Sequence, residues 1–264
     1  MLGLGASLSN GGEVPGFSPL DISGLDLWLR VNKGIVGEDG GDSAVGDMTD
    51  GEDITSWADQ SGNGRHALGD TQNEDRKPHW ETDAADFGGL KWPDVSANTH
   101  MDLTAGKEVK ILANTDFTIM LRVKITDFSA ARALIGATST DVIKTTTNKR
   151  VAVFIGGQPP IEFEEASDTL ADDTYYIHTL TRTDGSTGNL TYHIHGGSYS
   201  DKFWDDDSST RQDPDEFDLT NIGCAADGAI PFAGVIKDVM VWNGTALTSK
   251  QRNDMYLYID GQTY

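Results

Sequence analysis

The sequence predicts an all-β protein, an antiparallel β-sandwich or jelly roll with one short C-terminal helix. Three observations lead to this expectation. Short segments in which apolar and polar residues alternate with a period of two recur along most of the chain. Turn-forming residues separate these segments, and 30 of the 264 residues are glycine. Helical spacing of apolar residues occurs in one stretch, residues 247–259.

The predicted strands begin at residues 25–31, directly after a Ser-Gly turn. Residues 54–57 form a short strand that leads into a polar turn, and residues 117–125 carry the β-branched and aromatic content that strands favour. The sequence 184–188, Asp-Gly-Ser-Thr-Gly, predicts a hairpin. Further strands are expected at residues 132–137, 150–155, 161–164, 175–183, 190–195 and 232–242.

The predicted helix covers residues 248–258. Thr248 is a suitable N-cap, and Gln251 stands in the capping-box position three residues later. Met255, Tyr256 and Ile259 recur at helical spacing. We therefore expect at most one helix longer than two turns.

The length of 264 residues suits one large domain, assigned here to residues 21–264. Residues 1–20 are rich in Gly, Ser and Pro and are expected to be an extended arm. Two interpretations of the arm stand side by side: a disordered terminus, or a segment that docks on a neighbouring subunit. In the second interpretation the anchors are the apolar residues Leu2, Leu4, Leu8, Val14 and Phe17.

Composition excludes several classes of function. The chain has 42 Asp and Glu against 20 Lys and Arg, a formal net charge of −22. Such a charge repels nucleic-acid phosphates and anionic membrane surfaces, so we expect neither as a partner. No apolar stretch approaches the roughly 18 residues of a membrane span, and the N-terminus lacks the pattern of a secretory signal. The lone Cys224 excludes an internal disulfide and is expected to be a small buried residue.

Three segments resemble the laminin-G-like, or concanavalin-A-like, jelly-roll family. The segment after the second predicted strand resembles the family pattern W-x-D-x-S-G-N-G-x-x-A. Residues 117–123 are similar to the family's central strand, and residues 232–251 to its last strand and helix. The resemblance covers residues 21–260 and implies a concanavalin-A-like sandwich of lectin-like character. The first pattern is matched at Trp57, Asp59, Ser61, Gly62, Asn63, Gly64 and Ala67.

The motif residues also have structural explanations. Trp57 and Trp242 are expected to be buried between the sheets. The polar residues of segment 59–64 are expected to bond their own backbone in a tight turn, where the two glycines take positive φ. Gly234 would allow a neighbouring backbone to approach closely, or would permit a bulge.

The first twelve residues resemble the N-termini of structural proteins from tailed bacteriophages, especially marine ones. This resemblance implies a protein of the virion, acting as a capsid decoration, fibre or tail-associated component. Its partners would be other virion proteins, and it would form a homo-oligomer on the particle. The alternative is a carbohydrate-binding module that engages host-surface glycans.

A third class, glycoside hydrolase, requires two opposed carboxylates. Glu162 and Glu164 share a strand face but lack the Glu-x-Asp-x-Glu pattern of the glucanases. Their alternation is also what the solvent-exposed face of an antiparallel sheet shows. Nucleophile-elbow, Walker and zinc-helix motifs are absent from the sequence. His193 and His195 share another strand face, without an assignable third metal ligand. We therefore expect no enzymatic activity and name no catalytic residue.

Two candidate binding features lie near residues 203–216. Phe203 and Trp204 could stack on a sugar ring or anchor an interface. The neighbouring acidic loop is a candidate calcium site, although surface acid also serves solubility. Calcium is the one cofactor considered, and its candidate ligands are Asp205, Asp206, Asp207, Asp213 and Asp215.

Overall fold

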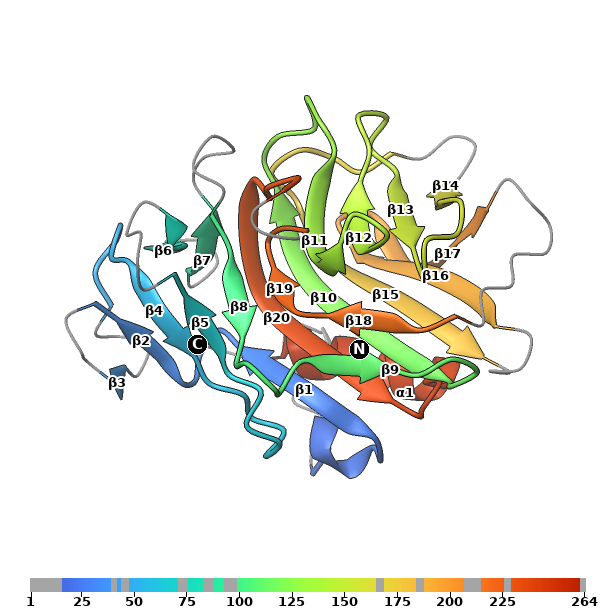
Figure 1. Cartoon of the computed structure of the whole chain (residues 1–264), viewed down its shortest axis with the longest axis horizontal. Coiled ribbons are helices and arrows are strands. Elements are labelled where there is room, and N and C mark those ends of the chain that lie inside the picture. Colours follow the sequence, from blue (N-terminus) through green and yellow to red (C-terminus); the bar gives the residue numbers. More distant parts are fainter. Residues whose placement is uncertain are drawn as a thin grey trace, which may run out of the picture.

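The computed structural model is a β-sandwich of two main sheets with one α-helix among the residues that it describes, which confirms the predicted fold class (Figure 1). Within the described residues, no helix has the length and hydropathy of a membrane span. The structure describes residues 16–38, 42–43, 48–70, 76–82, 88–92, 99–164, 169–183, 188–206, 215–225 and 229–261.

The first sheet, sheet A, is antiparallel throughout and carries the helix on its outer face. β1 (Leu25–Arg30) runs beside the second half of β20. The other strands, in spatial order, are β6 (His79–Glu81), β7 (Gly89–Trp92), β20 (Gly234–Asn243), β10 (Phe117–Ile125), β15 (Tyr175–Thr183), β16 (Asn189–Gly196) and β17 (Tyr199–Asp206).

The second sheet, sheet B, joins sheet A where its last strand pairs with the end of β17. A small separate ribbon pairs β9 (Val109–Ile111) with β18 (Phe217–Leu219). The strands of sheet B, in spatial order, are β3 (Asp42–Ser43), β2 (Ile35–Gly37), β4 (Ile54–Trp57), β5 (Ala67–Gly69), β8 (Met101–Leu103), β19 (Asn221–Ile222), β11 (Arg132–Thr138), β12 (Asp141–Thr145), β13 (Val151–Phe154) and β14 (Ile161–Glu164).

The main core lies between the two sheets and is built from the inward residues of alternating strands. Trp57 is completely buried there, as predicted, and its indole nitrogen donates to the Arg30 carbonyl oxygen at 2.9 Å. Cys224 is also buried, as predicted. Trp242 is buried too, but on the outer face of sheet A beneath the helix. The expectation that Trp242 lies between the sheets is therefore wrong, because its parity on β20 points it outward.

A β-bulge in β20 sets this parity. Arg122 of β10 faces Asp238, whereas Val123 faces Ile236, so β20 holds one extra residue, Lys237, at this point. The extra residue moves Ile236 into the main core. Gly234 begins the strand at φ 146°, and an added Cβ would lie 2.0 Å from the carbonyl oxygen of Lys124. The predicted close approach at this glycine is confirmed.

The polar turn after β4 is pinned to the first strand. Asp59 accepts hydrogen bonds from the backbone N–H of Ser61 at 2.9 Å and of Trp28 at 3.0 Å. Gly62 and Gly64 have φ values of 91° and 72°. The predicted self-bonded turn is confirmed, and the same Asp59 carboxylate also joins the turn to β1.

The helix α1 (Ser249–Asp260) begins with the predicted capping box. The side chain of Thr248 accepts a hydrogen bond from the backbone N–H of Gln251. In return, the side chain of Gln251 accepts one from the backbone N–H of Thr248 at 2.9 Å. Met255, Tyr256 and Ile259 face sheet A and are buried against its outer side. In Figure 1 the helix lies behind β10.

The chain before β1 packs on its own domain from residue 17 onward. A single 3-10 turn, η1 (Pro19–Asp21), precedes β1. The ring of Phe17 meets that of Tyr258 on α1 edge to face, with centroids 6.0 Å apart. Phe17 therefore contacts its own domain through an aromatic partner on α1, and its docking on a neighbouring subunit stays a prediction. The other predicted anchors, Leu2, Leu4, Leu8 and Val14, lie outside the described residues.

Candidate functional site

A row of residues crosses the outer face of sheet A and ends at an exposed aromatic ring. The strand registers place its members directly opposite one another. The helix covers the first part of the row: Tyr256 meets Thr179, with 3.2 Å between their hydroxyl oxygens. Beyond the helix the last ring remains exposed. From β20 to β17 the row is Met240, Met120, Thr179, His193 and Phe203.

Phe203 is 46% exposed and is the one aromatic residue among the exposed large apolar side chains of the described chain. It lies on β17, opposite His193, whose ring centroid is 5.4 Å away at an angle of 58°. The ring thus presents an open apolar surface at the margin of the helix.

A bulge in β17 lies two residues before Phe203, at Asp201. The register with β16 shifts between Ile194 and Gly196, and Asp201 has a φ of 46°. Asp is among the residues that tolerate this left-handed conformation, and bulges re-aim neighbouring side chains.

Asp201 is held by α1. Its carboxylate accepts from Arg252 Nε and Nη2, both at 3.2 Å, and from the Tyr256 hydroxyl at 2.9 Å. Arg252 is 7% exposed and also donates to the Leu247 carbonyl oxygen at 3.3 Å. The pair therefore joins the bulged strand to the start of the helix in a bidentate, charge-assisted contact.

His193 completes the cluster as a neutral imidazole. Burial, together with the Arg252 guanidinium, lowers its pKa to about 4, and the Asp201 carboxylate opposes both effects. Its Nε2 atom lies 3.1 Å from Nη2 of Arg252, so Nε2 accepts and the proton resides on Nδ1. Among the described residues, that buried Nδ1 has no hydrogen-bond partner.

His195 continues the same face toward the end of α1. Its ring stacks on Tyr256 at 4.4 Å and 9°, and its Nε2 atom lies 3.0 Å from Asp260. The predicted common face of His193 and His195 is confirmed. The group that meets His193 is a guanidinium, which repels a metal ion. We call Phe203, His193, Asp201, Arg252, His195 and Asp260 the Phe203 surface.

The structure corrects the other predicted sugar contact. Trp204 is completely buried in the main core, where its ring meets that of Tyr199 edge to face. The two neighbours Phe203 and Trp204 belong to a strand and not to a loop, so they point to opposite faces of the sheet. Only Phe203 remains available to a ligand.

The candidate calcium site lies mostly outside the described structure. Residues 207–214, with Asp207 and Asp213, are not described, nor are the side chains of Asp205 and Asp206. Asp215 accepts a hydrogen bond from Gln158 at 2.9 Å. In the part of the chain that the structure describes, no group of three or more His, Cys, Asp or Glu side chains could hold a metal ion.

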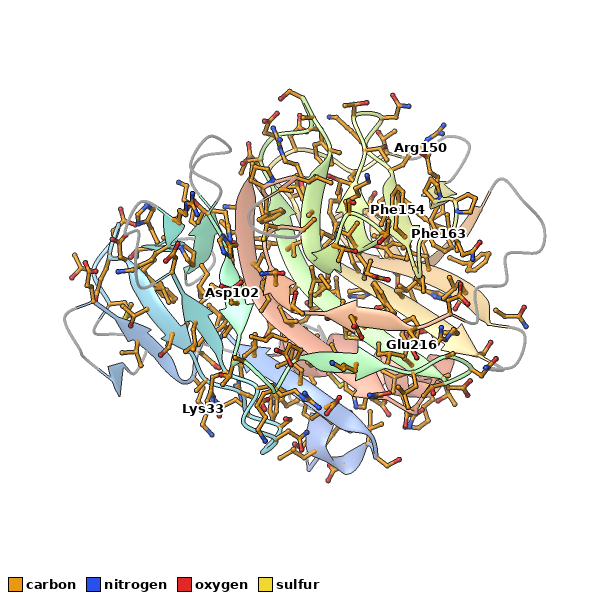
Figure 2. All side chains as sticks on the ribbon, in the orientation of Figure 1. Lys33, Asp102, Arg150, Phe154, Phe163 and Glu216 are labelled. Carbon is orange, nitrogen blue, oxygen red and sulfur yellow. The ribbon has the colours of Figure 1, made fainter. Side chains whose placement is uncertain are left out.

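The carboxylate stretch considered for hydrolysis lies on the outer face of sheet B. Glu162 is 4.0 Å from Arg150 in an ion pair, and the side chain of Glu164 is not described. Figure 2 labels Arg150 and Phe154, which stand at opposite ends of β13, Arg150 just before its first residue and Phe154 as its last. The Lys144 ammonium is 4.1 Å from the centre of the Phe154 ring, so this second aromatic already carries a cation on its face.

Three members of the cluster, Asp201, Arg252 and Asp260, were missed by the sequence analysis. Asp201 lies on a strand that the alternation did not reveal, and Arg252 and Asp260 lie on α1, Arg252 buried beside its apolar residues. From the sequence alone, a charged residue within a helix, such as Arg252, is expected to face solvent. One signal was present: Arg252 stands three residues before the buried Met255, on the same helical face.

No protein-family model and no curated protein matches the chain. Solved structures do. Domain 4 of an extracellular arabinanase from Geobacillus stearothermophilus, in complex with arabinotriose, is 14% identical with a TM-score of 0.54. The match covers 88% of this chain and 97% of that one. The botulinum neurotoxin serotype G binding domain is 14% identical with a TM-score of 0.53, over 89% of this chain and 51% of that one.

A third likeness is to a much longer protein. Trypanosoma rangeli sialidase, in complex with the inhibitor DANA, is 15% identical with a TM-score of 0.51. The match covers 90% of this chain but 33% of that one, so this chain spans about a third of the sialidase. At these identities the likenesses define a class by its fold: the protein is a jelly-roll β-sandwich.

Proposed function

We propose that the protein is a carbohydrate-binding module and that the Phe203 surface is its binding site. The observation that carries the proposal is the exposed Phe203 ring on the same strand as Asp201, with His193 in contact with both that ring and the Arg252 guanidinium that holds Asp201. A sugar ring presents an apolar C–H face and a rim of hydroxyl groups. An exposed aromatic ring accommodates the apolar face, and a fixed carboxylate accepts hydrogen bonds from the hydroxyls.

The preorganisation of the polar groups supports this proposal. Asp201 is held by Arg252 and Tyr256 before any ligand arrives. A ligand would therefore not have to order this carboxylate, and the entropy cost of binding would be smaller. The arabinanase domain, a protein of the same fold that was solved with arabinotriose bound, adds support.

We propose binding without hydrolysis. Asp201 is engaged by three hydrogen-bond donors, from Arg252 and Tyr256, so its carboxylate oxygens are already occupied by contacts within the protein. Glycoside hydrolysis requires a second carboxyl opposed to the first across the bond that is cleaved. The contacts of Asp201 suit a structural acceptor better than a reacting group.

The virion role stays a prediction. The residues whose pattern resembles phage structural proteins lie outside the described structure. Binding to a host-surface glycan and a place on a virion are compatible, and the sandwich would serve either protein equally well.

The test is a glycan array followed by calorimetry with Phe203→Ala. We expect the purified chain to bind at least one oligosaccharide on the array and the variant to bind it at least about tenfold more weakly, the equivalent of about 1.4 kcal/mol. Phe154→Ala is the matched control, because it removes an aromatic ring from the other outer face. Loss of binding in Phe154→Ala with full binding in Phe203→Ala would move the site to sheet B. Absence of binding across the array would refute the proposal.

A further inference from the structure

The guanidinium of the Phe203 surface is already engaged by a carboxylate of the protein itself. The Nε and Nη2 edge is the pair of donors that matches a ligand carboxylate. In Arg252 both atoms donate to Asp201 at 3.2 Å. Nη2 also meets His193 and Ser249, and Nη1 donates to a backbone carbonyl oxygen. Arg252 is also 7% exposed, so an acidic sugar would have to displace Asp201 to reach it.

Two polar side chains that remain accessible on the described part of the Phe203 surface are acceptors of hydrogen bonds. The side chains of Asp201 and Asp260 are 18% and 51% exposed, and both carry carboxylates. A carboxylate accepts from sugar hydroxyls and repels a sugar carboxylate or sulfate. The imidazole of His193, which lies between the ring and the guanidinium, adds no positive charge near neutral pH.

The net negative charge of the whole chain also disfavours anionic ligands. The formal net charge is −22. At physiological salt the Debye length is about 8 Å, so the nearest carboxylates contribute most and the distant ones little. An anionic ligand would meet repulsion both on approach and at the surface.

We infer that the Phe203 surface selects an uncharged glycan, whose hydroxyls donate to Asp201 while an apolar sugar face covers Phe203. Sugars that bear a carboxylate or sulfate at the contact are rejected. This inference rests on the proposed function, because it names the ligand class of the same site.

The experiment compares neutral oligosaccharides with acidic partners of the same length. The probes are galactotriose against trigalacturonate, cellotriose against its uronate, and lactose against sialyllactose, each titrated into the intact chain by calorimetry. We expect at least one neutral probe to bind and its acidic partner to bind roughly fivefold to tenfold more weakly. Raising the salt from about 0.01 M to about 1 M should narrow this difference, since screening shortens the Debye length from about 30 Å to about 3 Å.

Separate outcomes would overturn the inference and the proposed function. If the acidic partner binds more tightly and Phe203→Ala abolishes that binding, the site stands and the inference fails. If a neutral probe binds equally well to Phe203→Ala, the site itself is wrong. Asp260→Asn removes one of the two accessible carboxylates of the surface and should therefore reduce the difference in affinity between the neutral probe and its acidic partner. If Asp260→Asn leaves the difference in affinity between the two probes unchanged, repulsion by this carboxylate does not cause that difference.

Discussion

The carboxylate of Asp201 and the guanidinium of Arg252 meet through two hydrogen bonds of 3.2 Å across 51 positions of sequence. The contact joins the bulge of β17 to the first turns of α1. It fixes one carboxylate two residues before Phe203 on β17 and occupies the guanidinium edge that a ligand carboxylate would need. One pair of residues thus links the docking of the helix to the chemistry of the proposed site.

Replacing Arg252 by Met should destabilise the fold. The substitution leaves Asp201 partly buried without its cation, and breaking such a pair typically costs about 3–5 kcal/mol. Urea unfolding should therefore show a lower midpoint with an unchanged slope. Lys250→Met is the control, because the Lys250 side chain is 84% exposed on the same helix. It should change stability by less than about 0.5 kcal/mol. Equal midpoints for the two variants would contradict the assigned contact.

Trp242→Ala should cost about 3–5 kcal/mol, the usual loss for a large buried aromatic residue. The indole is completely buried between sheet A and α1, so its removal leaves a cavity under the helix. Thermal unfolding followed by circular dichroism measures the loss. Phe203→Ala, which removes an exposed ring, should keep a melting temperature close to that of the wild type. A Trp242→Ala protein that melts like the wild type would show that α1 does not pack there.

Gly234→Ala should be far more disruptive than Gly62→Ala. Both glycines have positive φ, 146° and 91°, so both substitutions carry backbone strain of about 1–2 kcal/mol. At Gly234 the new Cβ would also lie 2.0 Å from the carbonyl oxygen of Lys124, whereas nothing lies within 4 Å at Gly62. The free energies of unfolding of the two variants, measured with denaturant, separate the cost of backbone strain, which both share, from the cost of the steric clash, which only Gly234→Ala has. Similar losses would argue that the bulged end of β20 can shift freely.

Acidification should weaken the fold through His178. Burial lowers the pKa of His178 to about 3 in the folded state, below the value of 6.5 for a free imidazole. Below about pH 6.5 His178 is therefore protonated in the unfolded chain but stays neutral in the folded chain. The free energy of unfolding falls as the pH decreases from about 6.5, by about 2 kcal/mol at pH 5. His178→Gln should flatten this dependence. Unfolding free energies measured between pH 5 and pH 7 test the sign.

Asp238 should make the fold more stable as the pH falls, opposite to the effect of His178, over part of the same pH range. Burial raises the pKa of Asp238 to about 6, although Arg122, Arg30 and Lys237 lower it in part. The folded chain holds this proton more tightly than the unfolded chain, so this residue costs stability as the pH rises from about 4 through 6. Asp238→Asn removes that contribution and should steepen the loss on acidification. An unchanged curve in Asp238→Asn would show that Asp238 ionises as freely in the fold as in the unfolded chain.

Much of the fold could be predicted because its signals are local. The turn of Asp59 and Ser61, the capping box of Thr248 and Gln251, and the burial of Trp57 each depend on neighbouring residues or on one strand's alternation. The proposed site was predicted only at Phe203 and the His193–His195 face. Its charged members come from two elements whose contact depends on the whole sheet.

By itself the sequence determined that this chain is an antiparallel sandwich with a single capped helix, because period-two alternation, turn residues and caps act over a few residues. Only the tertiary structure decided which face each residue occupies. The extra Lys237 in β20 inverts the strand's parity, strand β17 turns Trp204 inward and Phe203 outward, and α1 brings Arg252 to Asp201. Register and docking depend on the packing of distant segments, and a shift of one residue exchanges the faces of a strand.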